Sequence, residues 1–277
     1  TQLALRKSRR ELMAVHCRMK KDLEAAAKIQ QTLLPSGGPG IEGVRCAWRY
    51  RPCDELAGDT LNVIPFDKHR VGLYVLDVSG HGVPSSLLSV ILSRSLSAAD
   101  DGSSVLWTTD ETTQQRRVAS PVEVADELSR RFPYDEVNHQ YFTMVYGVLD
   151  SERQTFTYVS AGHPPILQLD SEGEAVLHSS TGPPVALIPA EVAPSIFEQA
   201  EIELAPGDRL YLYSDGVPEA KGPEDEDFGE DRIIEALRPT LEEDLDASIS
   251  ALLEQVWTWG GGGCPGDDVS VLAVEIS

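Results

Sequence analysis

The sequence has few cysteines and no long apolar run. Its 277 residues include four cysteines, Cys17, Cys46, Cys53 and Cys264, which are too scattered for a zinc knuckle or a CxxC redox pair. We therefore expect reduced thiols in a cytoplasmic protein rather than a disulfide framework. No stretch approaches the 18 apolar residues of a membrane span, and the first residues lack a signal-peptide pattern. Neither a membrane partner nor secretion is expected.

Basic charge is also scarce outside the start of the chain. The net charge is −22, yet residues 1–28 hold eight Lys or Arg and three acids, which leaves 15 basic and 42 acidic residues in the remainder. A body with a balance of −27 repels polyanions. We therefore expect no nucleic-acid partner, and a metal-dependent nuclease is disfavoured. A body this acidic tolerates, or needs, bound cations.

The first residues have the pattern of a long helix that ends at Pro35 and is followed by a glycine-rich break. Apolar side chains recur every seven residues at Leu5, Leu12, Met19, Ala26 and Leu33. A narrow apolar stripe favours pairing with another helix, so residues 1–35 are predicted to be a linker or coiled-coil helix that forms a homodimer. The alternative is a helix that packs on its own domain. Because the chain has no initiator Met, we expect it to belong to something longer.

The rest of the chain, residues 40–277, alternates short apolar runs with turn signals, which is typical of strands joined by loops. Predicted strands cover residues 44–51, 61–66, 73–78, 141–149, 155–160, 166–169, 202–204, 209–213 and 269–276. Predicted helices cover residues 84–96, 232–237 and 245–257. Ser120 and Glu123 form a capping box that begins a further helix. The polar, Thr-rich residues 98–118 are expected to form a mobile loop.

Aspartates stand at four strand boundaries, each beside a glycine or a second acid: Asp59, Asp77, Asp215 and the pair Asp267 and Asp268. Taken singly, such an acid is equally typical of an ordinary turn. If strands 61–66 and 73–78 pair antiparallel in a suitable register, Asp59 and Asp77 lie close together. Four carboxylates brought together repel one another unless cations lie between them, and two divalent ions carry the compensating charge.

The type of ligand indicates the type of metal and reaction. Carboxylates without His or Cys favour Mg²⁺ or Mn²⁺ over zinc or copper. Two such ions about 4 Å apart lower the pKa of a bridging water and orient phosphoryl oxygens for in-line attack. The pattern therefore predicts hydrolysis of a phosphate ester without a protein nucleophile.

Other residues are weaker candidates. His81 is a possible proton donor to the leaving oxygen and Arg51 a possible phosphate ligand, but a loop role and a surface role are favoured for them. His163 lies between Gly162 and Pro164 and is expected to brace a loop. Trp257 and Trp259 are expected to cap the core.

Six segments, in this order, resemble the PPM-type metal-dependent serine/threonine phosphatases, and more narrowly their bacterial SpoIIE/RsbU-like branch. They are LAGDT (56–60), DVSGHGVPSSLLSV (77–90), FTMVYGVLD (142–150), YVSAGHPP (158–165), LAPGDRLYLYSDGVPEA (204–220) and GDDVSVLAVE (266–275). The match covers residues 40–277. AAAKIQQTLLP (25–35) also resembles the segment that joins a receiver or sensor domain to such phosphatases, so an upstream domain of that kind is implied.

The resemblance implies an α/β (α+β) fold, an αββα sandwich with two central antiparallel sheets. It implies two ions, Mn²⁺ or Mg²⁺, with Asp59 bridging both and Asp77 holding one beside the carbonyl of Val78. Asp215 and Asp267 would complete the coordination, directly or through water, and the neighbouring Asp268 is a further candidate metal ligand. Two positions depart from the family pattern: Ala57 replaces a glycine and Asn62 an acid, which puts an extra, weakly held metal in doubt.

The resemblance also implies an activity and a substrate. It indicates a phosphatase that acts on a phosphoserine or phosphothreonine of a regulatory protein, a STAS-type anti-sigma-factor antagonist in partner-switching signalling. The alternative is a binding module that keeps the fold and has lost the chemistry. Retention of all the acids argues against that alternative.

Overall fold

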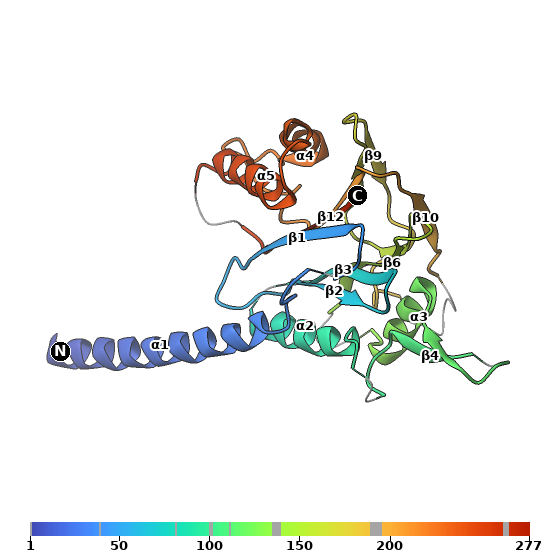
Figure 1. Cartoon of the computed structure of the whole chain (residues 1–277). Helices are drawn as coiled ribbons and strands as arrows, with labels where there is room; N and C mark the ends of the chain where they lie inside the picture. Colours follow the sequence, from blue (N-terminus) through green and yellow to red (C-terminus); the bar gives the residue numbers. More distant parts are fainter. Residues whose placement is uncertain are drawn as a thin grey trace.

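The computed structural model describes residues 2–38, 40–80, 82–99, 102–110, 112–134, 140–188, 196–262 and 266–277. Two five-stranded antiparallel sheets pack face to face, and helices cover both outer faces (Figure 1). This is the αββα sandwich that the resemblance implies.

The first sheet gathers the N-terminal and C-terminal strands. Its order is β1 (Val44–Arg51), β12 (Val269–Ile276), β11 (Arg209–Tyr213), β8 (Ile166–Leu169) and β9 (Ala175–His178). Its outer face is covered by α4 (Gly229–Leu237), η1 (Arg238–Thr240) and α5 (Leu245–Trp259). The register places Arg51 opposite Val269, so β1 ends where β12 begins.

The second sheet has β3 near its middle. Its order is β10 (Ala200–Glu203), β7 (Thr155–Ala161), β6 (Phe142–Asp150), β3 (Arg70–Val78) and β2 (Thr60–Pro65). Its outer face is covered by α2 (Val83–Ser95) and α3 (Pro121–Arg131). Strands β2 and β3 pair antiparallel, which confirms the pairing on which the proximity of Asp59 and Asp77 depends.

Strand β3 is buried on both faces. Leu73 and Val75 lie in the apolar layer between the sheets with Leu212 of β11, whereas Tyr74 and Leu76 lie in the layer under the helices. Because successive strand residues point to opposite faces, a run that is apolar at every position fits this central place.

Two local predictions have opposite outcomes. Helix α3 begins as predicted, because the Ser120 side chain accepts from the Glu123 N–H and the Glu123 side chain accepts from the Ser120 N–H. The expectation of a plain loop over residues 98–118 is wrong: β4 (Trp107–Thr109) and β5 (Arg116–Val118) form a hairpin there. Its Trp107 ring meets Phe66 edge to face at 5.5 Å, a contact that local sequence does not reveal.

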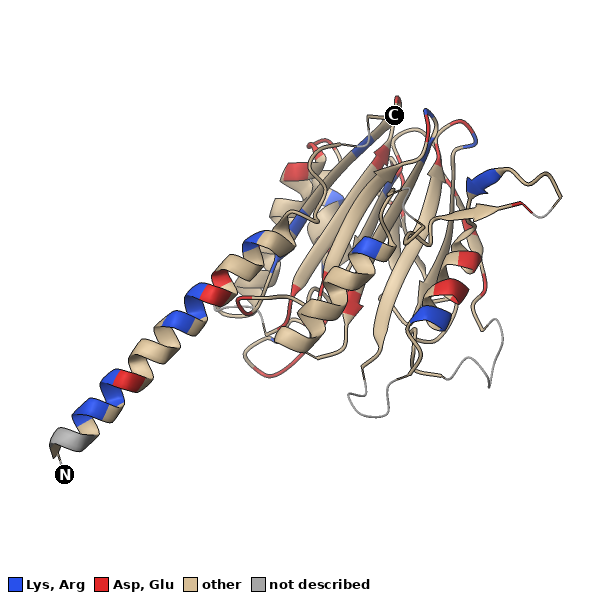
Figure 2. Ribbon diagram, turned by 90° about the horizontal axis from the view of Figure 1, so that it is seen from below, with Lys and Arg blue, Asp and Glu red and all other residues tan. Residues whose placement is uncertain are grey.

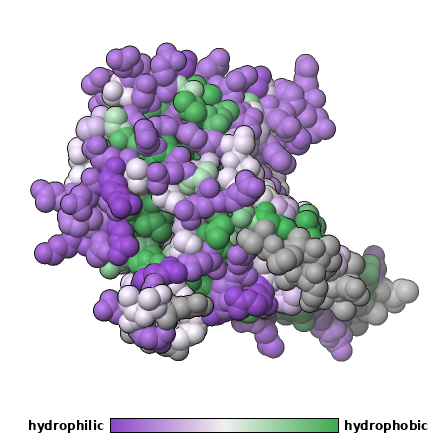
Figure 3. All heavy atoms as spheres, turned by 90° about the vertical axis from the view of Figure 1, so that its right-hand side faces the viewer, coloured by the Kyte–Doolittle hydropathy of each residue, from purple (hydrophilic) through white to green (hydrophobic). Residues whose placement is uncertain are grey.

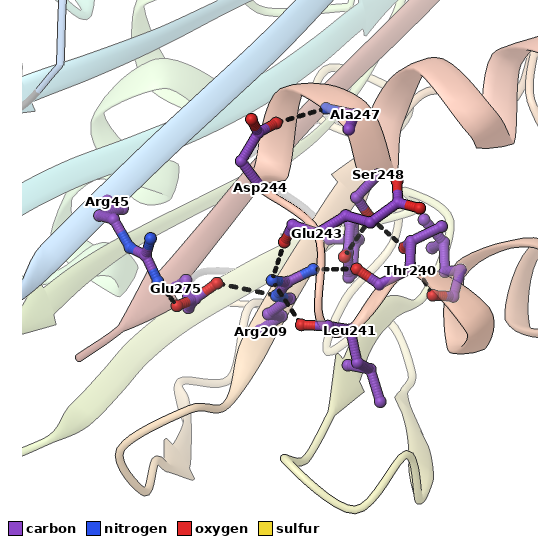
Figure 4. Close-up of polar contacts among 11 residues, drawn as sticks. Arg45, Arg209, Thr240, Leu241, Glu243, Asp244, Ala247, Ser248 and Glu275 are labelled. Carbon is purple, nitrogen blue, oxygen red and sulfur yellow. Dashed lines mark hydrogen bonds and ion pairs between the residues drawn. The ribbon is translucent and has the colours of Figure 1, made fainter.

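A buried ion-pair network fixes the segment between η1 and α5 to the first sheet (Figure 4). Arg209, which is 3% exposed, donates to Glu275 at 2.8 Å and to the carbonyls of Thr240, Leu241 and Glu243. Arg45 pairs with the same Glu275. The buried charges are thus paired and hydrogen-bonded, as burial requires.

Helix α1 (Gln2–Gln31) extends away from the sandwich and carries Lys and Arg along its length (Figures 1 and 2). On its outer part the predicted apolar stripe is exposed, with Leu5 at 71%, Leu12 at 70% and Met19 at 57%. Farther along, Ala26 is half-buried and Gln30 is buried. Only the last turns of α1 therefore pack on the body.

The surface in Figure 3 is mostly hydrophilic, with the apolar residues in small groups. Among the described residues, no helix combines the length and the apolar character that crossing a membrane requires. Cys17, Cys46 and Cys53 are free thiols, while Cys264 lies outside the described residues.

Candidate metal centre

The second sheet brings the first two aspartates together. Thr60 lies opposite Leu76 in the β2–β3 ladder, so Asp59, one residue before Thr60, adjoins Asp77. A Cβ atom at Gly58 would lie 2.8 Å from the carbonyl oxygen of Val78, so glycine is required for this close approach of backbones. The Asp59 carboxylate, the Asp77 carboxylate and the Val78 carbonyl, which the resemblance assigns to one metal, thus lie together.

The first sheet supplies the other acids through a second close contact. The Ser214 N–H donates to the Ser270 carbonyl at 3.0 Å, and the Ser270 N–H donates to the Ser214 hydroxyl at 2.9 Å. A Cβ atom at Gly216 would overlap the carbonyl oxygen of Asp268. Asp215 is therefore held beside the segment that carries Asp267 and Asp268.

Asp267 and Asp268 have different surroundings. Asp268 is 4% exposed and accepts from the Cys53 N–H and the Gly58 N–H, both at 2.8 Å. It ties the loop before Asp59 to β12. Asp267 is exposed, and its carboxylate accepts from the Asp268 N–H at 2.8 Å.

Mutual repulsion shows that the carboxylates from both sheets face one another. Burial raises the pKa of Asp77 to about 7, and the charges of Asp215 and Asp267 add to the effect. Burial also raises the pKa of Asp215 to about 6, followed by the charges of Asp267 and Glu219. The pKa of Asp59 is raised by burial first and then by Asp77. Like charges gathered in a partly desolvated place have this effect.

Asp59 provides the test of whether a cation fits. It is 1% exposed, and neither of its oxygens has a hydrogen bond of normal geometry from the described residues, although the hydroxyls of Ser214 and Ser270 lie near enough to lower its pKa in part. A buried carboxylate without a partner is costly. Hard oxygen donors in this arrangement fit Mg²⁺ or Mn²⁺.

Cys53 adds a sulfur to the rim of the cluster. Ligand atoms of Cys53, Asp267 and Asp268 lie within 4.8 Å of one another. Burial, and then the charge of Asp268, raises the pKa of the Cys53 thiol to about 12. A protonated thiol is a poor metal ligand, so the oxygen donors define the chemistry of the site.

Sequence reasoning missed Gln30, which joins helix α1 to the cluster. Its side-chain amide donates to the Ala57 carbonyl at 2.7 Å and to the Ser89 hydroxyl on α2 at 3.0 Å, and its carbonyl accepts from the Ala57 N–H. Ala57 is two residues before Asp59. A signal that points to this residue is a single Gln on the Ala-rich face of the last helical turns, where a core side chain is expected.

Asn62, which stands where the family has an acid, has a structural contact. Its amide donates to the Leu33 carbonyl at 3.2 Å, while its oxygen accepts from the Val63 N–H at 2.8 Å. It therefore anchors the segment that follows α1.

The remaining candidates lie around the cluster. His163 is buried, its Nδ1 is 2.9 Å from the Thr143 hydroxyl, and burial lowers its pKa to about 3, so it braces its loop as a neutral side chain. The Arg51 guanidinium stacks on the Trp257 ring, 4.4 Å from its centre. Trp257 and Trp259 pack against the core under α5, as predicted. His81 lies outside the described residues.

The match to a family model identifies the class of protein. Residues 67–277 match the model "Stage II sporulation protein E (SpoIIE)". The chain therefore belongs to the SpoIIE family, close to RsbP and RsbU, and has the PP2C-type phosphatase fold.

Two curated relatives are named as phosphoserine phosphatases. The chain is 33% identical to "Phosphoserine phosphatase RsbP" of Bacillus subtilis over 206 residues, which are 72% of this chain and 45% of that protein. It is 24% identical to "Phosphoserine phosphatase RsbU" of B. subtilis over 210 residues, 76% of this chain and 57% of that one. The chain thus spans about half the length of the curated relatives it matches.

Solved structures support the fold. The SiaA-PP2C domain of Pseudomonas aeruginosa superposes with a TM-score of 0.76 at 19% identity and covers 95% of this chain and 99% of its own. RsbX, solved in complex with magnesium, superposes with a TM-score of 0.57 at 13% identity over 85% of this chain and 96% of its own.

Proposed function

We propose that this protein is a Mn²⁺- or Mg²⁺-dependent phosphatase that removes phosphate from a serine or threonine of a regulatory protein. The observation that carries the proposal is Asp59, a buried carboxylate that has no hydrogen bond of normal geometry from the described residues and is faced by acids from both sheets. Relatives named phosphoserine phosphatases support the reaction.

The residues have separate tasks in this proposal. Asp59 would contact two ions, Asp77 and the Val78 carbonyl would hold one of them, and Asp215 with Asp267 would hold the other. When bound, two such ions supply a water of lowered pKa and a positively charged site that binds phosphoryl oxygens.

The surrounding structure fixes these groups. Asp268 holds the loop that carries Asp59 through two N–H groups, so its task is positioning. The close contact at Gly58 fixes Asp59 against Val78, and the close contact at Gly216 fixes Asp215 against Asp268. Such preorganisation is what electrostatic catalysis requires.

Replacing one acid tests the assignment. We expect Asp77→Asn to abolish Mn²⁺-dependent hydrolysis of p-nitrophenyl phosphate and of a phosphoserine peptide, while circular dichroism shows an intact fold. Glu172→Gln, at an exposed acid in the β8–β9 turn, is the matched control. Unchanged turnover in Asp77→Asn would remove the site assignment, and an inactive wild-type protein that still binds phosphoproteins would favour the binding-module alternative.

We also propose the partners. The substrate is a phosphorylated STAS-type anti-sigma-factor antagonist, as the family resemblance implies. The exposed stripe of α1 supports pairing of two copies and connection to an upstream receiver or sensor domain. Light scattering that gives a monomer both with and without residues 1–34 would contradict the pairing.

A further inference from the structure

The outer edge of the first sheet carries a second surface with its own chemistry. Strand β1 is the last strand on its side of this sheet, because β12 pairs with only one of its edges. Three cavities of about 530, 450 and 370 Å³ follow one another along β1. The first two share Arg49 and Tyr50, and the last two share Cys46 and Ala47. Together they form a groove beside α5, which lies above β1 in Figure 1.

Arginines line this groove at alternate positions of the strand. Arg45, Arg49 and Arg51 share one face with Ala47 because strand side chains have a period of two, and Ala47 packs into the core under α5. Strand β1 therefore holds three of the 15 basic residues outside residues 1–28, and no acid.

Among the described residues, two of these arginines are neutralised by ion pairs and one is not. Arg45 pairs with Glu275. Arg49 pairs with the exposed Asp246 at 2.6 Å. Arg51 is exposed and stacks on Trp257, and it has no ion pair with a carboxylate in the part of the chain that the structure describes. Acids line the same cavities, with Asp244 and Asp246 toward the Arg45 end and Glu254 of α5 beside Arg51. Arg51, at the end of the groove nearest the carboxylate cluster, is therefore the group that is complementary to an acidic side chain of a ligand.

The groove leads to the candidate metal centre. Arg51 pairs with Val269, which follows Asp268 in the chain, and the Cys53 N–H binds the Asp268 carboxylate. A chain segment that lies along β1 therefore ends at the carboxylate cluster.

We propose that this groove binds an acidic, extended segment of the phosphoprotein substrate, next to its phosphorylated residue. The inference rests on the proposed phosphatase function. Eight strand residues span about 26 Å at ~3.3 Å each, so the segment is about eight residues long. An extended peptide also satisfies the outer backbone groups of an edge strand, and the arginines then select acidic side chains.

Two phosphoserine peptides of equal length test the proposal, one with Asp and Glu around the phosphoserine and the other with Lys. Their kcat/KM values are measured with the full chain and Mn²⁺, and p-nitrophenyl phosphate serves as the small substrate. We expect the acidic peptide to be preferred by about two- to fivefold, the size of an exposed ion pair. Arg49→Gln should reduce that preference through KM and leave turnover of p-nitrophenyl phosphate unchanged. The double variant with Arg51→Gln should abolish the preference.

A charge control and a length control sharpen the test. Arg153→Gln removes an exposed arginine in the β6–β7 turn, at the opposite end of β6 from Thr143, and should leave the preference intact. Shortening the acidic peptide to three residues should remove the preference. A preference that survives the double variant, or a wild-type protein without one, would overturn the proposal.

Binding separates this inference from the proposed function. Fluorescence anisotropy of the labelled acidic peptide in the presence of chelator measures docking without turnover. Arg49-dependent binding by a protein that hydrolyses nothing would support the groove and refute the phosphatase. Hydrolysis of all substrates with equal binding of both peptides would refute the groove and support the phosphatase.

Discussion

Removing divalent cations should make the stability of this protein fall as pH rises. Without cations, the pKa of Asp77 is about 7 and that of Asp215 about 6, above the value of 3.8 expected for an unfolded Asp. A raised folded-state pKa means that the folded protein binds more protons than the unfolded chain between these values. The stabilisation that these extra protons give the folded protein is complete below the unfolded pKa and is lost as pH rises through the folded pKa.

The size of the effect follows from the same values. Above pH 5, folded Asp77 keeps its extra proton for about two pH units, up to its pKa, and folded Asp215 keeps its proton for about one. Each pH unit corresponds to ~1.36 kcal/mol of the free energy of unfolding. The free energy of unfolding should therefore drop by about 4 kcal/mol, as an upper value, because the two groups share part of their repulsion. Cations at 100 times their dissociation constant should restore about 2.7 kcal/mol.

Urea unfolding measures this directly. The curves are recorded at pH 5 and pH 8 with EDTA, and again with Mn²⁺. We expect the drop with EDTA, a smaller drop in Asp77→Asn, and higher stability at pH 8 once Mn²⁺ is present. Metal-free stability that is constant or rises between pH 5 and pH 8 would refute the picture of mutually repelling carboxylates.

Three further substitutions follow from single contacts. Gln30→Ala removes the partner of the Ala57 N–H and leaves the Ala57 carbonyl with only the longer bond from the Ser89 hydroxyl. It should therefore raise the Mn²⁺ concentration for half-maximal activity several-fold, whereas Gln31→Ala, at an exposed position, should not. Gly216→Ala forces a methyl group onto the Asp268 carbonyl and should abolish Mn²⁺ binding by calorimetry; normal binding would contradict the close packing. Arg209→Met leaves buried acceptors unpaired and should lower the free energy of unfolding by about 3–5 kcal/mol in urea, and a loss below 1 kcal/mol would show that the network is dispensable.

Sequence patterns predicted the approach of the first two aspartates better than the contacts that support them. Asp77 was recognisable as an acid at the end of an apolar run, and Asp59 as an acid beside a glycine at the start of a predicted strand, and the β2–β3 ladder places them side by side. The different surroundings of Asp267 and Asp268 were not predictable, because adjacent acids look alike until the N–H groups of Cys53 and Gly58 are placed.

Long-range contacts account for the errors in the fold. The hairpin of β4 and β5 is short and polar, and its Trp107 packs on Phe66 from a distant part of the chain. Strand β9 was missed for a similar reason, since Val176 is 50% exposed and its short run lacks the alternation of a half-buried strand. Gln30 escaped notice because its partner, Ala57, is 27 residues away.

The carboxylates of the cluster come from the two different sheets of the sandwich, Asp59 and Asp77 from one sheet and Asp215 and Asp267 from the other. The distance between the sheets is set by the side chains packed between them, Leu73 among them. A shorter side chain at such a position, well away from any acid, would alter the gap between the two groups of aspartates. Interior residues that never meet a substrate are thus under the same geometric constraint as the ligands themselves.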